Sequence, residues 1–156
     1  MAMPKVPINF VSATSGEMFS LGQITIRVME DGSHTDNRIG SAEFTLPPQI
    51  GGPPAHWHEM HDETFMVTKG SVRFHAPEGK TIDAKVGDFV TVPTRAPHTF
   101  SNPFDEEAKF LCTFTPAFYI NYFRILGEMV EKGVAMDKEI NLEVMARYAT
   151  LPAEGM

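Results

Sequence analysis

Cysteine is nearly absent from this sequence of 156 residues, which has only Cys112. A lone cysteine excludes an intrachain disulfide and a cysteine-based zinc site. Because Leu111 and Phe114 beside it are apolar, we expect a buried and unreactive thiol. The sequence also lacks an apolar run of the ~20 residues that a bilayer requires, and residues 1–10 do not have the basic head and apolar core of a signal peptide. We therefore expect a cytoplasmic protein that does not associate with membranes.

Positive charge is also scarce. Thirteen Lys and Arg against twenty Asp and Glu give a net charge of -7, and no basic cluster stands out. Such a surface repels phosphate backbones, so we expect no nucleic-acid partner. The sequence has neither a Gly-rich phosphate loop followed by Lys-Ser or Lys-Thr nor a Gly-x-Ser-x-Gly elbow, so nucleotide hydrolysis and serine hydrolase chemistry have no support.

The composition is that of an ordinary globular protein, with 42% apolar residues, 21% charged residues and twelve Phe. A chain of this length buries roughly two thirds of its unfolded surface. We therefore expect one ordered domain over residues 1–156, without internal repeats.

Short alternating runs of apolar and polar residues, separated by Gly, Pro, Asn and Asp, fill residues 17–115. This pattern predicts strands, and so many short strands favour an antiparallel sandwich or barrel. Lys69-Gly70 and Glu78-Gly79 fit tight hairpin turns. The nine expected strands are 24–30, 41–46, 55–58, 63–69, 71–75, 80–85, 89–92, 98–101 and 108–115.

After Pro116 the apolar residues recur at helical spacing, and Gly133 stands where a helix would end. A second helix fits residues 142–149, with Asn141 as its N-cap. About forty residues are too few for an independent core. We therefore expect this helical tail, residues 117–150, to pack against the wall of a barrel formed by residues 17–115.

Six of the eight residues from His56 to Glu63 are His, Glu or Asp. Residues i and i+2 of a strand share a face, so His56 and His58 project together about 7 Å apart along the chain. Two imidazoles can bind one first-row metal, and a carboxylate at the head of the next strand, Glu63, would balance its charge. His98, which opens a later strand, could supply a fourth ligand from across the barrel.

Simpler interpretations of these residues remain. The strand could be a polar surface strand that carries histidines, and His98 alone could be a hydrogen-bonded core residue. His61 and Asp62 break the strand alternation, so we expect them, with Glu59, on a solvated turn and not as ligands.

The pattern resembles that of the cupin superfamily. One stretch is similar to the first cupin motif: His56-Trp57-His58, then four residues, Glu63, six further residues and Gly70. Another stretch is similar to the second motif: Gly87, then five residues, Pro93, four residues, His98, three residues and Asn102. Two motif positions differ from the family: Ile50 and Arg95 stand where glycines are usual, so we expect the turn after Pro93 to be made differently.

The resemblance implies an all-β fold, a double-stranded β-helix or jelly-roll barrel, here with a short C-terminal helical tail. It also implies one divalent transition metal ion, Fe, Mn, Ni, Cu, Co or Zn, on His56, His58, Glu63 and His98. Among residues of inward strand parity, we expect four to line a substrate pocket: Phe65, Val67, Phe74 and Phe100.

Residues 51–56 and a helix after Thr115-Pro116-Ala117 resemble single-cupin proteins of the quercetin 2,3-dioxygenase type. This narrower resemblance implies a dioxygenase for a small aromatic or enolisable oxygenated substrate, with Glu63 as both ligand and catalytic base. Two alternatives are a metal-dependent isomerase or lyase for a small sugar or acid, and a non-catalytic cupin that binds a small ligand. The family and the need to cover sheet edges predict a homodimer.

Overall fold

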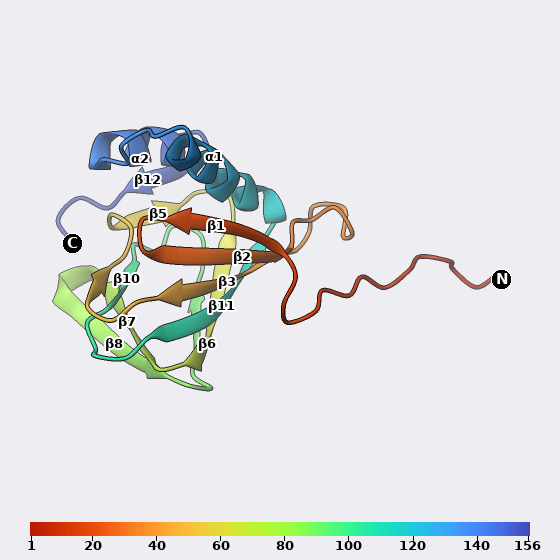
Figure 1. Cartoon of the computed structure of the whole chain (residues 1–156), viewed down its shortest axis with the longest axis horizontal. Helices are drawn as coiled ribbons and strands as arrows, with labels where there is room; N and C mark the ends of the chain where they lie inside the picture. The colour runs from red at the N-terminus through yellow and green to blue at the C-terminus, as the bar shows by residue number, and fades with distance from the viewer.

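Two antiparallel sheets form the body of the structure, a computed structural model that describes all 156 residues (Figure 1). The six-stranded sheet has the order β1 (Glu17–Leu21), β2 (Ile24–Glu30), β3 (Gly40–Leu46), β11 (Ala108–Thr115), β6 (Asp62–Lys69) and β9 (Phe89–Val92). The four-stranded sheet has the order β4 (Ile50–Gly51), β10 (Thr99–Asn102), β7 (Ser71–Ala76) and β8 (Lys80–Lys85). A third pair joins β5 (His56–His58) to β12 (Thr150–Pro152). The predicted antiparallel barrel is confirmed.

The barrel interior follows from the alternation within each strand. In β3 and β11, every second residue is buried, so each strand turns one apolar face inward. The centre is aromatic. Phe110 is fully buried and stacks on Phe44, with ring centroids 4.8 Å apart, and Phe65 and Phe100 meet its ring edgewise. Of these rings, Phe44, Phe65 and Phe100 also line the cavity described below.

The nine expected strands all occur, with ends within one residue of the prediction, and β1, β4 and β12 are additional. One turn was predicted wrongly. The chain reverses at Gly70, which has φ of 63°, but β6 and β7 belong to different sheets and do not pair as a hairpin. The turn at Glu78 and Gly79 does join a paired hairpin, β7 and β8, and both residues have positive φ.

The C-terminal tail consists of a short 3-10 turn, η2 (Ala117–Tyr119), and two helices, α1 (Ile120–Glu131) and α2 (Lys138–Ala146). The predicted start of α2 was wrong, because its N-cap is Asp137, whose carboxylate accepts a hydrogen bond of 2.8 Å from the backbone N–H of Ile140. The helices lie beside β1 and β12 (Figure 1). Neither has both the length and the apolar character needed to cross a membrane.

Candidate metal centre

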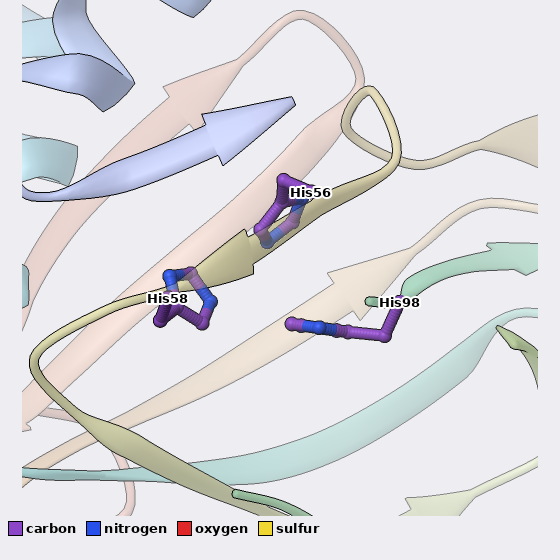
Figure 2. A group of neighbouring side chains, drawn as sticks. All are labelled: His56, His58 and His98. Atoms are coloured by element: carbon purple, nitrogen blue, oxygen red, sulfur yellow. The ribbon is translucent and has the colours of Figure 1, made fainter. Parts of the chain in front are cut away.

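Local backbone pairing places the three histidines. His56 and His58 both point inward from β5 and are buried, whereas Trp57 between them faces the other way and is half-buried. His98 lies just before β10 and forms an antiparallel bridge with His56. In this bridge each backbone N–H donates to the carbonyl of the other residue, at 3.0 and 2.8 Å. Figure 2 shows the three rings turned toward one common space.

The four predicted ligands come together. One ring nitrogen from each of His56, His58 and His98 lies within 4.8 Å of the others. Glu63, at the start of β6, is also buried. Its Oε1 lies 3.2 Å from Nε2 of His58, and its Oε2 lies 3.2 Å from Nε2 of His98. The cluster thus offers three imidazoles and one carboxylate, a donor set suited to first-row divalent metals.

Hydrogen bonds on the outer side of the rings set their tautomers. Nδ1 of His56 donates to the carbonyl of Pro54 at 2.7 Å, and Nδ1 of His98 donates to the carbonyl of Ala96 at 3.0 Å. A carbonyl can only accept, so in each neutral ring Nδ1 carries the proton and Nε2 keeps a free lone pair. This is the arrangement by which metal-binding histidines are oriented.

The ring nitrogens and the carboxylate oxygen that face one another within the cluster have no positively charged partner. Nε2 of His58 is buried and has no hydrogen-bond partner. Nε2 of His98 and Oε2 of Glu63 are both acceptors when the ring is neutral, yet they lie 3.2 Å apart. Only a shared proton or a cation satisfies such a pair of atoms. The residues therefore fit a divalent metal ion at this position.

The charge states suit metal binding as well. Burial, followed by the neighbouring His98 and His58, lowers the pKa of His56 to about 3. Burial alone would raise the pKa of Glu63, but the surrounding imidazoles, His58 foremost, hold it well below its usual value. A neutral imidazole beside an ionised carboxylate is the form in which each group binds a metal.

His61 was predicted wrongly. It is not on a solvated turn but 1% exposed, and its Nε2 donates to Oε1 of Glu63 at 3.2 Å. Its ring packs on His58 and Tyr119, with centroids 4.0 and 4.4 Å away. The alternation of side chains along a strand does not predict the direction of His61, because the chain bends between β5 and β6. Asp62 is exposed as expected, but it is the first residue of β6; Glu59 lies in the bend and is half-buried.

Comparisons with known proteins agree with this geometry. Residues 42–114 match the family described as "Cupin domain". Quercetin 2,3-dioxygenase of Bacillus subtilis (strain 168) is 30% identical over 76 residues, which are 49% of this chain but only 22% of that enzyme. Residues 42–114 of this chain are therefore a cupin domain.

Solved structures share the fold. The polyketide cyclase RemF from Streptomyces resistomycificus superposes with a TM-score of 0.62 at 20% identity, over 74% of this chain and 93% of that chain. An RmlC-like cupin from Shewanella frigidimarina gives 0.60 at 18% identity, over 71% and 93%. A predicted oxalate decarboxylase from Thermotoga maritima gives 0.59 at 22%, over 70% and 99%. At these identities, the likeness establishes the cupin fold and not a shared reaction.

Both departures from the cupin motifs are accommodated by the backbone. Arg95 takes φ of 67°, the left-handed conformation that favours glycine, so the expectation of a different turn was wrong. Its N–H donates to the carbonyl of His58 at 2.7 Å, and its guanidinium pairs with Glu59. Near Ile50, the position that requires glycine is Gly52, because a Cβ there would lie 1.9 Å from the carbonyl oxygen of Phe100.

A cavity of about 420 Å³ opens onto the cluster. Of its 23 lining residues, 14 are hydrophobic, and Glu63 is the only carboxylate; Lys and Arg are absent from the lining. Of the four residues expected to line a substrate pocket, Phe65 and Phe100 line this cavity, whereas Val67 and Phe74 are buried in the core and do not. Strand parity identifies the inward face but not the height of a residue along the barrel.

The helical tail forms part of the same cavity wall. Tyr122 and Phe123 of α1 and Asn141 of α2 line it, and the hydroxyl of Tyr122 donates to Oδ1 of Asn141 at 2.5 Å. Cys112 also lines it and is buried as expected, and burial raises the pKa of its thiol well above the usual value. The helical tail therefore both packs against the barrel and supplies part of the cavity lining.

Proposed function

We propose that this cupin is a metal-dependent dioxygenase that acts on a small, neutral aromatic or enolisable substrate. The observation that carries the proposal is the mainly apolar cavity, whose lining includes His56, Glu63 and His98 of the cluster. Its volume of about 420 Å³ lies within the usual range of small-molecule sites. The partial match to quercetin 2,3-dioxygenase also supports it.

The cavity lining favours a neutral substrate over a phosphorylated sugar or a dicarboxylate. Such anions need a cationic partner when they leave water, and the lining offers no Lys or Arg. One oxygen of an anion could approach the cluster, but a second charge would be left against apolar walls. The aromatic walls, including Phe65, Phe100 and Phe123, instead suit a flat ring.

In this proposal, His56, His58, Glu63 and His98 hold the metal ion, which would supply a Lewis-acidic position for a substrate oxygen and the redox chemistry of dioxygen. Glu63, kept ionised by the imidazoles, accepts the proton of the substrate hydroxyl or enol. His61 holds Oε1 of this carboxylate in place. The apolar walls exclude water, and the Tyr122–Asn141 pair faces the cavity where it can orient a polar substituent.

The test is dioxygen uptake by the purified protein, reconstituted separately with iron, copper, nickel, manganese or cobalt and supplied with flavonols or catechols. We expect uptake with at least one metal, and a loss of about 10²-fold or more in Glu63→Gln, which keeps the shape of the side chain but cannot accept the proton. His75→Asn, which changes a histidine outside the cluster, should retain the activity. Metal-loaded protein that consumes no dioxygen with any of these substrates would overturn the proposal.

The same assay separates the alternatives. Product formed without dioxygen uptake would indicate redox-neutral chemistry at Glu63, as in an isomerase, a lyase or a cyclase such as the one RemF is named for. Tight binding without product would indicate a ligand-binding cupin.

We also propose that the chain forms a homodimer. Strands β1 and β9 are the two edges of the six-stranded sheet. On β9, Phe89 is 58% exposed and lies opposite the exposed Met66 of β6. A second copy would cover these apolar side chains. Light scattering coupled to size-exclusion chromatography should give twice the chain mass, and a monomer at micromolar concentration would contradict this.

A further inference from the structure

The C-terminal strand lies along the strand that carries two of the proposed metal ligands (Figure 2, blue strand). In the pairing of β12 with β5, Thr150 stands opposite His58 and Pro152 stands opposite His56. Two backbone bonds of 2.9 Å extend the pairing at its ends, from the N–H of Glu59 to the carbonyl of Ala149 and from the N–H of Ala153 to the carbonyl of Ala55. The tail is thus attached along the whole length of β5.

Thr150 contacts His58 directly. Its side chain is fully buried, and Oγ1 lies 2.8 Å from Nδ1 of His58. The hydroxyl donates its single proton to the carbonyl of Tyr148 at 3.3 Å. Oγ1 must therefore accept from His58, so that Nδ1 carries the ring proton and Nε2 presents its lone pair to the cluster.

This contact differs from those of the other two histidines. His56 and His98 donate to carbonyls only two residues away, at Pro54 and Ala96, so their orientation is set by residues next to them in the sequence. The partner of His58 lies 92 residues further along the chain. The orientation of His58 consequently depends on the C-terminal segment being in place.

We propose that Thr150 is a positioning residue for the metal centre, which fixes the tautomer and the direction of His58 and so couples metal affinity to the docking of β12. The inference rests on the metal site of the proposed function but not on its reaction. Partners of this kind on metal-binding histidines typically contribute 10- to 100-fold in metal affinity.

The first measurement uses metal-free protein labelled with ¹⁵N. Long-range ¹H–¹⁵N correlations report which nitrogen of His58 carries the proton. We expect the Nδ1–H form in the wild type and in Thr150→Ser, which keeps the hydroxyl, and a mixture of tautomers in Thr150→Val. Unchanged Nδ1–H signals in Thr150→Val would overturn the proposal, whether or not the protein binds a metal.

The second measurement is the dissociation constant of Co²⁺, with the Co²⁺ absorption spectrum as a report on coordination. Thr150→Val should weaken binding about 10- to 100-fold and alter the spectrum, and Thr150→Ser should restore both. Val72→Ala is the matched control, because it removes buried volume from β7, which belongs to the four-stranded sheet and not to the pair of β5 and β12. It should lower the unfolding temperature but leave the His58 tautomer and the Co²⁺ affinity unchanged.

Equal weakening by Val72→Ala would show that Thr150 acts only through stability, and the positioning role would be wrong. If Thr150→Val does not fold, Thr150→Ala provides the same comparison. If the wild type binds none of the metals, the metal-dependent function fails, but the tautomer measurement still decides whether Thr150 orients His58.

Discussion

Metal removal should destabilise this protein, because the metal-free cluster buries polar atoms without partners. Nε2 of His58 has none, and Nε2 of His98 faces Oε2 of Glu63, acceptor to acceptor, at 3.2 Å. A buried polar atom left unsatisfied costs about 1–3 kcal/mol. A metal ion that binds only the folded chain removes this penalty, and the relief is part of its binding free energy.

The size of the effect follows from mass action. At a free metal concentration 100 times the dissociation constant, folding gains about 2.7 kcal/mol. A domain of this length shifts its unfolding temperature by roughly 2–4 °C for each kcal/mol. We therefore expect loading to raise the unfolding temperature by about 5–11 °C.

Thermal unfolding followed by circular dichroism tests this, first after dialysis against a chelator and then with each metal added back. His58→Ala should unfold at the same temperature with and without metal, because it removes a donor from the centre of the cluster. His75→Asn should shift as the wild type does, because its ring is bonded to Ser101 outside the cluster. Equal unfolding temperatures for the chelated and loaded wild type, or a full shift in His58→Ala, would refute the reasoning.

Three further outcomes follow from the packing. Phe110→Ala should lower the free energy of unfolding by about 3–5 kcal/mol in chemical denaturation, because the ring is fully buried at the centre of the aromatic core, and a loss below about 1 kcal/mol would contradict that packing. Arg95→Gly should unfold at nearly the same denaturant concentration as the wild type, whereas Arg95→Val should unfold earlier, because a β-branched residue resists the positive φ at this position; equal midpoints for the two variants would argue against the turn. His61→Leu should weaken metal binding about 10- to 100-fold in a competition assay, because Glu63 loses the donor that holds Oε1. A variant that binds the metal as tightly as the wild type would show that this contact does not contribute to metal affinity.

The strands could be predicted because their alternation is long enough to be distinctive. In β3 and β11, seven and eight residues alternate between buried and partly exposed positions. β4 and β12 have only two and three residues, and each exists through its pairing partner. No periodicity can be read from so short a segment.

The placement of side chains could be predicted where residue spacing reflects strand geometry, but not where the chain bends. His56 and His58 share a face because they are two apart on one strand, which the sequence shows directly. His61 enters the cluster through a bend, and parity does not extend across it. The density of histidines in this stretch was the only signal, and it did not separate a turn residue from a buried one.

Contacts between distant segments were beyond sequence reasoning. Thr150 reaches His58 from the far end of the chain, and no motif marks it. Phe65 and Val67 have the same strand parity, but only Phe65 lines the cavity. The height of a side chain along the barrel depends on strand tilt and packing, which a single sequence does not report.

The central claim, that His56, His58, Glu63 and His98 hold one divalent metal ion, is tested most directly by anomalous diffraction at the metal absorption edge from crystals of the purified protein. The account predicts one ion per chain, about 2.0–2.2 Å from a nitrogen of each histidine and an oxygen of Glu63. Crystals grown with saturating metal that show no anomalous peak between these side chains, or a peak only at another site, would contradict it.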